Sequence, residues 1–158
     1  MVKSILSKTK EAIITLLIML SIVFSYGFGP GMSEMDWLNW SNKCLTESFN
    51  PSTDIKLKKW EIMLTPEHFI RLRKTYQHGK QEYYSFNLNK LDSVNFLGTA
   101  MAGELRFKTL ADDIIVQTYE DPKGDIDSMA TALNIPVKGM TPGRIDSLND
   151  AIKYLKER

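Results

Sequence analysis

Cysteine and histidine are both scarce in this chain of 158 residues, and their scarcity excludes several kinds of site. Cys44 is the one cysteine, so no disulfide forms within the chain and no cysteine-based metal cluster is available. We expect Cys44 to pack as a small apolar side chain; the alternative is a disulfide with another molecule in an oxidising compartment. The two histidines, His68 and His78, fall on one predicted helix about 15 Å apart, too far for one metal ion to bridge.

The chain also lacks net charge and chemical signature motifs. Residues 33–158 carry 17 basic and 18 acidic side chains. A nearly neutral domain has no extended basic surface to displace counterions, so we do not expect nucleic acid as a partner. No glycine-rich phosphate loop, nucleophile elbow or metalloprotease motif occurs. The sequence therefore gives no reason to expect a cofactor or a catalytic constellation.

The chain does contain one long stretch without charge, Ala12 to Phe28. As a helix it spans about 26 Å, slightly less than the ~30 Å hydrocarbon core of a bilayer. Two interpretations stay open: a retained transmembrane helix, or a signal peptide with small residues such as Ser25 and Gly27 near its cleavage site. The long basic segment before the stretch, with Glu11 next to its apolar core, favours the anchor.

Both interpretations give the same orientation. Lys3, Lys8 and Lys10 precede the apolar stretch, so the positive-inside rule places the N-terminus in the cytoplasm and the remainder outside, in the periplasm or the extracellular space. We divide the chain into a cytoplasmic basic tail at 1–11, the anchor or signal core at 12–29, a juxtamembrane helix and linker at 30–54, and an extracytoplasmic domain at 55–158.

Aromatic residues cluster around the predicted membrane exit, where amphipathic rings favour the headgroup level. The membrane-interface candidates are Tyr26, Phe28, Trp37 and Trp40. A helix that begins at Ser33 or Asp36 carries the two tryptophans, and it packs either on the membrane surface or on the domain. Its polar face is not basic, which favours packing on the domain.

The rest of the sequence predicts an α+β domain. Alternation and β-branched residues predict strands at 56–64, 81–88, 104–108, 112–119 and 129–137, while 92–98 either continues the sheet or crosses its end. The frame Thr-Pro-x-x-apolar-x-x-Leu occurs at Thr65 and again at Thr141, and each copy predicts the start of a helix, over 65–78 and 141–155. We expect a mostly antiparallel sheet of four to five strands, covered on one face by two helices, with its other face solvated or bound to a partner.

Two groups of charged residues are candidate sites. The turn at 121–125 and its flank contain Asp121, Asp125 and Asp127, which offer the oxygen ligands that Ca²⁺ prefers, although their spacing is not that of an EF-hand; the alternative is a solvated turn. On the first predicted helix, Arg71, Lys74 and His78 share a polar face and are candidate partner-binding residues.

Charge is also separated along the chain. Residues 56–80 carry a net charge of +5 and residues 112–127 carry −5. Such blocks either steer association with a charged partner or another copy of the chain, or they neutralise each other within the fold.

These observations give three hypotheses. The first is a membrane-anchored, outward-facing, non-enzymatic binding or accessory subunit of a cell-envelope complex, whose partners are the membrane and another envelope protein or a further copy of itself. The second is a signal-cleaved secreted or periplasmic protein that binds a ligand or acts as an immunity-type inhibitor. The third is an envelope hydrolase that uses His68 or His78.

Overall fold

The computed structural model describes residues 31–158, so the predicted anchor or signal segment, with Tyr26 and Phe28, lies outside the described residues. The compact unit runs from Glu34 to Arg158. It is an α+β domain with antiparallel sheets and two helices, as the sequence predicts. Within residues 31–158, neither helix has the length and apolar character needed to cross a membrane.

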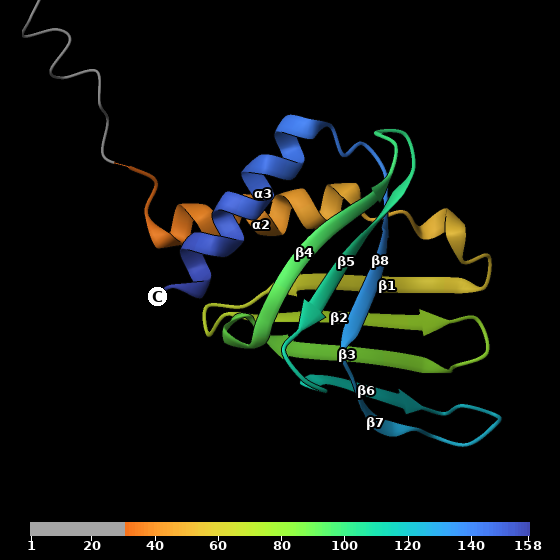
Figure 1. Ribbon diagram of the computed structural model, residues 1–158. Helices are drawn as coiled ribbons and strands as arrows, with labels where there is room; N and C mark the ends of the chain where they lie inside the picture. The colour runs from red at the N-terminus through yellow and green to blue at the C-terminus, as the bar shows by residue number, and fades with distance from the viewer. Residues whose placement is uncertain (1–30) are drawn as a thin grey trace, which may run out of the picture. The chain divides into compact units, whose positions relative to one another are not determined.

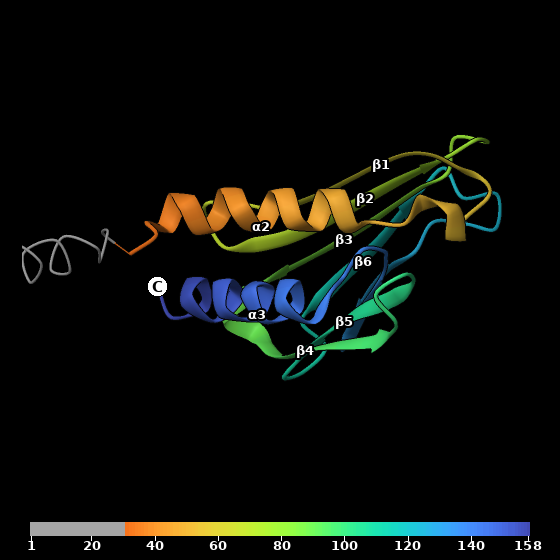
Figure 2. The same ribbon diagram turned by 90° about the horizontal axis from the view of Figure 1, so that it is seen from above.

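The two helices are α2 (Glu34–Ser48) and α3 (Pro142–Lys156). They run antiparallel and side by side (Figures 1 and 2), with the Trp37 ring 6.0 Å from the Tyr154 ring near one end and Arg144 Nε 3.3 Å from Cys44 Sγ nearer the other. Both helices were predicted near these bounds. The segment that we assigned to a juxtamembrane helix therefore belongs to the compact unit.

The larger sheet has five strands in the order β1-β2-β3-β6-β7, and every neighbouring pair is antiparallel. Its strands are β1 (Leu57–Leu64), β2 (Phe69–Tyr76), β3 (Gln81–Asn87), β6 (Ile114–Tyr119) and β7 (Asp127–Ala130). A short 3₁₀ helix, η1 (Pro51–Thr53), precedes β1. The predicted turn at 121–125 does connect β6 to β7.

The smaller sheet has three antiparallel strands in the order β4-β5-β8, and these are β4 (Leu91–Gly98), β5 (Gly103–Thr109) and β8 (Ala132–Val137). A second 3₁₀ helix, η2 (Leu88–Lys90), leads from β3 into β4. The three strands cross the strands of the larger sheet steeply (Figure 1). The two helices lie together beyond β1, the edge strand of the larger sheet, with α2 next to β1 (Figures 1 and 2).

Three expectations need correction. The helix predicted at 65–78 is wrong, because these residues form a turn and strand β2. The strand predicted at 129–137 is two strands, β7 and β8, which belong to different sheets. The single sheet covered by two helices is instead a five-stranded sheet whose inner face packs on a second sheet and on α2 and α3.

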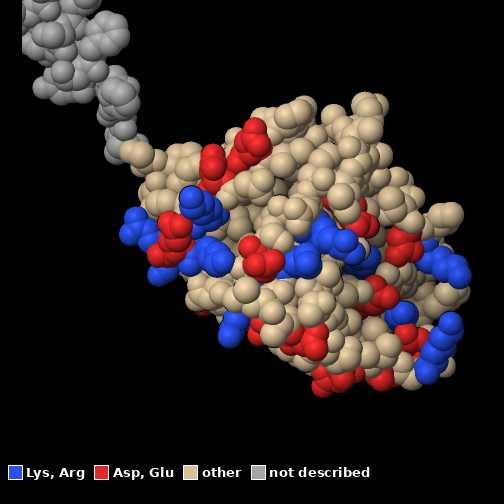
Figure 3. Space-filling view, in the orientation of Figure 1, with Lys and Arg blue, Asp and Glu red and all other residues tan. Residues whose placement is uncertain are grey.

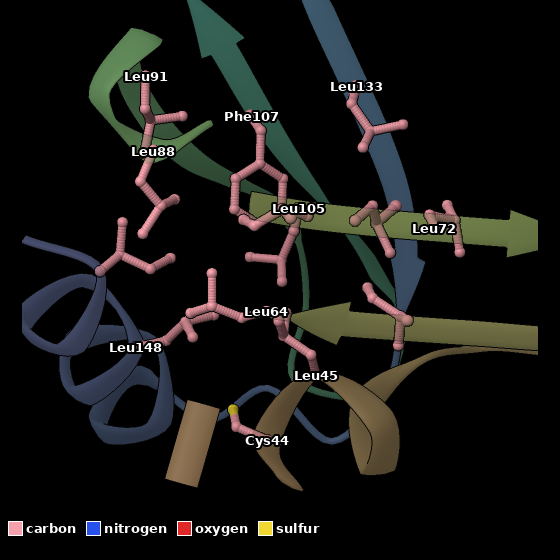
Figure 4. Close-up of a cluster of buried hydrophobic side chains, with 14 of the residues drawn as sticks. Cys44, Leu45, Leu64, Leu72, Leu88, Leu91, Leu105, Phe107, Leu133 and Leu148 are labelled. Atoms are coloured by element: carbon pink, nitrogen blue, oxygen red, sulfur yellow. The ribbon is translucent and has the colours of Figure 1, made fainter. Parts of the chain in front are cut away.

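The hydrophobic core fills the space between the two sheets and the helices (Figure 4). Fully buried side chains from both sheets meet there, and the rings of Phe86 on β3 and Phe107 on β5 lie 5.9 Å apart. Leu45 and Cys44 enter from α2 and Leu148 from α3. Cys44 is free and buried in the core, which agrees with its expected role as a small apolar side chain.

A side chain of α2 closes one edge of the larger sheet. The Asn42 amide donates from Nδ2 to the carbonyl of Leu64 at 2.9 Å, and its Oδ1 accepts from the Leu64 N–H at 2.7 Å. These are the two bonds that a neighbouring strand makes to a residue of an edge strand. Asn42 thus satisfies the last residue of β1, which has no strand on that side.

Candidate interaction surface

The larger sheet turns its second face away from the core. We call this surface the outer face, and its residues come from alternate positions of β1, β2, β3, β6 and β7 because successive side chains of a strand point to opposite sides. The strand register aligns them in rows across the sheet. One row is Met63, Arg71, Ser85, Ile115 and Met129, the next is Glu61, Arg73, Tyr83, Gln117 and Asp127, and a third is Lys59, Thr75, Gln81 and Tyr119.

Two arginines on β2 dominate the first half of the outer face. Arg71 and Arg73 are both exposed. Their guanidinium carbons lie 5.7 Å from the centre of the Phe69 ring and 5.8 Å from the centre of the Tyr83 ring, respectively, within the range of a cation–π contact. Neither arginine forms an ion pair with any residue of the described chain. Both guanidinium groups therefore keep their donors free for a carboxylate from elsewhere.

A hollow of about 540 Å³ opens on the outer face between β2 and the β6–β7 turn. Tyr83, Gln81 and Tyr119 contribute from the strands, Arg73 lies on one side, and the carboxylates of Glu120 and Asp125 lie on the other. A smaller hollow of about 180 Å³ adjoins it and is lined by Glu61, Met63, Arg71, Arg73 and Tyr83. The surface is thus uneven, with aromatic and amide groups between opposite charges.

The backbone at the acidic side of the hollow is unusual. Glu120 has a φ of 55°, a left-handed conformation that residues with a Cβ adopt rarely. Its carboxylate lies over the β2–β3 turn, where a Cβ on Gly79 would come within 2.8 Å of Oε2. Glycine at this position therefore allows Glu120 to sit against the neighbouring turn at the lip of the hollow.

On the opposite side of the same sheet, several polar side chains bind one another through hydrogen bonds and ion pairs, and we call them the inner polar cluster. The Glu82 carboxylate accepts hydrogen bonds from Tyr76 Oη at 2.8 Å and Tyr84 Oη at 3.2 Å, and it lies 3.1 Å from Lys80 Nζ. Lys80 also pairs with Asp121 at 2.9 Å. This cluster uses its charges within the fold.

The pKa values of the inner polar cluster follow from these contacts. Burial, followed by the hydrogen bond to Glu82, raises the pKa of Tyr76, and burial next to the negative Glu82 raises the pKa of Tyr84 to about 12. The hydrogen bond to Asp121 raises the pKa of Lys80. The backbone N–H of Lys123 and then the side chain of Lys80 lower the pKa of Asp121.

The structure separates the predicted partner-binding residues. Arg71 lies on the outer face, Lys74 points to the other side of β2, and His78 is exposed in the β2–β3 turn. They do not share a surface, because the segment is a strand rather than a helix. Trp37 and Trp40 are half-buried and pack against the core, which agrees with the expectation that their helix packs on the domain.

The aspartates proposed for calcium are engaged in local hydrogen bonds. Asp121 pairs with Lys80, Asp125 Oδ1 accepts from the backbone N–H of Asp121 at 3.0 Å, and Asp127 Oδ1 accepts from Gln117 at 3.2 Å. Within residues 31–158, no three His, Cys, Asp or Glu side chains are grouped so as to hold a metal ion.

The histidines lie apart from each other. His68 Nε2 is 3.2 Å from Glu34 Oε1 at the start of α2, whereas His78 lies in the β2–β3 turn. In the described part of the chain, neither side chain hydrogen-bonds to a serine hydroxyl or the cysteine thiol.

Sequence reasoning missed most of the outer face, notably Arg73, Tyr83 and Tyr119. A signal for it was present in FIRLRKTY, where Ile70 and Leu72 alternate with Arg71 and Arg73 as in a strand with one buried face. The Thr-Pro frame before it is typical of a helix start, and it led to the prediction of a helix instead of a strand. The charge blocks meet in one ion pair, Lys80 with Asp121, and no second pair joins them within the described residues.

Comparisons with protein-family models, with curated proteins and with solved structures find no match to this chain.

Proposed function

We propose that the chain is a membrane-anchored, outward-facing interaction module without enzymatic activity, which binds a protein of the cell envelope through the outer face. The observation that carries this proposal is the pair Arg71 and Arg73. They lie exposed beside aromatic rings on the face of the larger sheet that points away from the core.

The other residues of the outer face support the same conclusion. Arginine, tyrosine and methionine are enriched where proteins bind each other, and tyrosine and arginine are frequent hot spots. The outer face offers Tyr83 together with the exposed apolar groups of Met63, Tyr119 and Met129. Hydrogen-bonding groups such as Gln81 lie among them. This mixture suits a partner protein better than a lipid surface.

The sequence supports the location of the module. The uncharged stretch from Ala12 to Phe28 follows three lysines and precedes the domain, which is the order of a single-span anchor with its domain outside. A module held at a membrane meets its partner in two dimensions, where a modest affinity suffices because tethering raises the local concentration.

A second candidate is a signal-cleaved secreted or periplasmic binder. It is favoured by the hollow of about 540 Å³, whose size lies in the range of small-ligand sites and whose walls carry opposite charges. Such a site fits a dipolar ligand, with an anionic group near Arg73 and a cationic group near Glu120 and Asp125.

One experiment separates the two candidates. A photo-crosslinking amino acid is placed at Gln81 on the outer face of the full-length chain, and a control chain carries it at Asn95, which is exposed on β4 of the smaller sheet. The chain is expressed in its own host, the cells are fractionated, and the intact mass is measured. We expect full-length protein in the membrane fraction and a discrete protein cross-link from Gln81 but not from Asn95.

A shortened, soluble species without a protein cross-link at Gln81 would replace the anchored module with the secreted binder. Equal cross-linking from both positions would remove the outer face as the binding surface.

A further inference from the structure

Charge on the outer face is divided between its two halves. The half formed by β1 and β2 carries Lys59, Arg71 and Arg73, while the half formed by β6, β7 and their turn carries Glu120, Asp125 and Asp127. The central strand β3 contributes neutral side chains, including Tyr83 and Gln81, between the halves. Each half also contains one opposite charge, Glu61 in the first and Lys123 at the tip of the turn in the second.

The charges of these residues are not neutralised by ion pairs inside the described domain, although Asp125 and Asp127 accept local hydrogen bonds. Within residues 31–158, the two arginines and the three acidic residues Glu120, Asp125 and Asp127 form no ion pairs. The side of the domain that carries α3 and the smaller sheet is different, because its basic and acidic side chains lie intermixed (Figure 3). The charge of the outer face therefore changes sign across the sheet, from basic on β2 to acidic on β7.

We infer that the partner of the outer face is a second copy of the same chain, in a two-fold symmetric dimer. This inference rests on the proposed function, which assigns the outer face to protein binding. A self-complementary interface needs one surface that carries both members of each contact, arranged about an axis. A two-fold axis parallel to β3 places β1 and β2 of one copy over β6 and β7 of the other. The strand register then sets Arg73 of each copy over Gln117 of the other, one strand from Asp127. Glu61 lies over Asp127, so the attraction is between the two charged halves as a whole and not between directly opposed residues.

The apolar groups follow the same symmetry. Met63 on β1 and Met129 on β7 occupy the two ends of one cross-strand row, and both are exposed. The same axis brings Met63 of one copy to Met129 of the other. Tyr83 lies near the axis, in the centre of the interface, where aromatic side chains contribute most to binding.

Charge reversal tests this inference. One full-length variant carries Arg71→Glu and Arg73→Glu, and a second carries Glu120→Lys and Asp125→Lys, so each has an outer face dominated by one sign of charge. A matched control carries Arg106→Glu and Lys108→Glu, two exposed basic residues with the same spacing on β5 of the smaller sheet. Sedimentation velocity in mild detergent measures the mass of each protein, and circular dichroism verifies that each is folded.

We expect the wild type and the control to be dimers, and each reversal variant alone to associate at least about tenfold more weakly. Mixing the two reversal variants in equal amounts should restore a dimer, because an acidic face then meets a basic one. Restoration on mixing is specific to this interface, since a variant that merely misfolds is not rescued by a partner.

A monomeric wild type, or a dimer that both reversal variants retain, would overturn the inference. If the wild type is monomeric while Gln81 cross-links to a different protein, the second copy is excluded and the interaction module stands. If the wild type is monomeric and Gln81 gives no cross-link, both proposals fail.

Discussion

The two faces of the five-stranded sheet are made by the same strands, yet their polar and aromatic side chains differ in environment. Those of the inner face are buried or bonded to one another, and those of the outer face are more exposed. On the inner face, Phe86 meets Phe107 in the core, and Glu82 is bound by Tyr76, Tyr84 and Lys80. On the outer face, Tyr83 is half-exposed and Arg73 beside it has no ion-pair partner within the described chain. Since neighbouring residues of a strand point to opposite faces, one segment contributes side chains both to the core and to the exposed surface.

The largest expected difference between the faces is in stability, and two aromatic residues of β3 measure it. Replacing Phe86, which is 1% exposed, by alanine leaves a cavity in the core and should lower the free energy of unfolding by about 3–5 kcal/mol. Replacing Tyr83 on the outer face by alanine should lower it by less than about 1 kcal/mol. Urea denaturation followed by tryptophan fluorescence gives both values. Equal losses would mean that the outer face contributes as much to the free energy of unfolding as the inner face does.

The edge between the two faces provides the next largest effect. Asn42→Ala removes both hydrogen bonds to the backbone of Leu64 and leaves that edge residue unsatisfied, so the free energy of unfolding should fall by about 1–3 kcal/mol. Asn39→Ala is the matched control, because Asn39 is exposed on the same helix. The same urea denaturation measures both variants. A loss of unfolding free energy no greater than that of the control would show that water satisfies the Leu64 backbone as well as Asn42 does.

The smallest effect concerns pH and the inner polar cluster. The pKa values of Tyr76, Tyr84 and Lys80 are raised in the folded state, so their stabilisation is complete below the unfolded values near 10 and is lost as pH rises through the folded values. The free energy of unfolding should therefore decline above pH of about 10. Tyr76→Phe and Tyr84→Phe together should reduce that decline in a denaturation series from pH 8 to pH of about 12. An unchanged decline in the double variant would assign it to other groups.

The sequence predicted the fold class because its strongest signals are local. DDIIVQTY contains β6, and the apolar stripe that includes Leu148, Ile152 and Leu155 places α3 correctly. Pro136 lies in β8 at the edge of the smaller sheet, where a strand tolerates the missing N–H of proline. The division into two sheets was not predictable in the same way, since it depends on which strands pair, and one residue, Thr131, separates β7 from β8.

The two Thr-Pro frames show where local reasoning fails. After Thr141, Pro142 begins a helix, as predicted. After Thr65, the chain makes a turn in which His68 has a φ of 61° and Thr65 bonds through its backbone to His68 and Phe69. Both starts are compatible with proline, so the residues that follow decide the outcome. Ile70 and Leu72 bury alternate positions of β2, and this pairing with β1 and β3 overrides the helical start.

The outer face was even less predictable, because it is a property of register. Arg71, Arg73, Tyr83 and Asp127 come to lie on one face through the alignment of four strands, and no segment of the sequence contains that alignment. The charge blocks indicated that opposite charges are separated along the chain, but only strand order places them on opposite halves of one surface.

The order of the strands has a consequence for how the domain comes together. The chain completes β1, β2 and β3, leaves for β4 and β5, returns for β6 and β7, and leaves again for β8. Neither sheet is therefore a continuous segment, and each is unfinished until late in the chain. Contacts between distant residues must form together, which favours slow and cooperative folding. The domain should open as a single unit rather than sheet by sheet, and a fragment that ends before β8 lacks an edge of its smaller sheet.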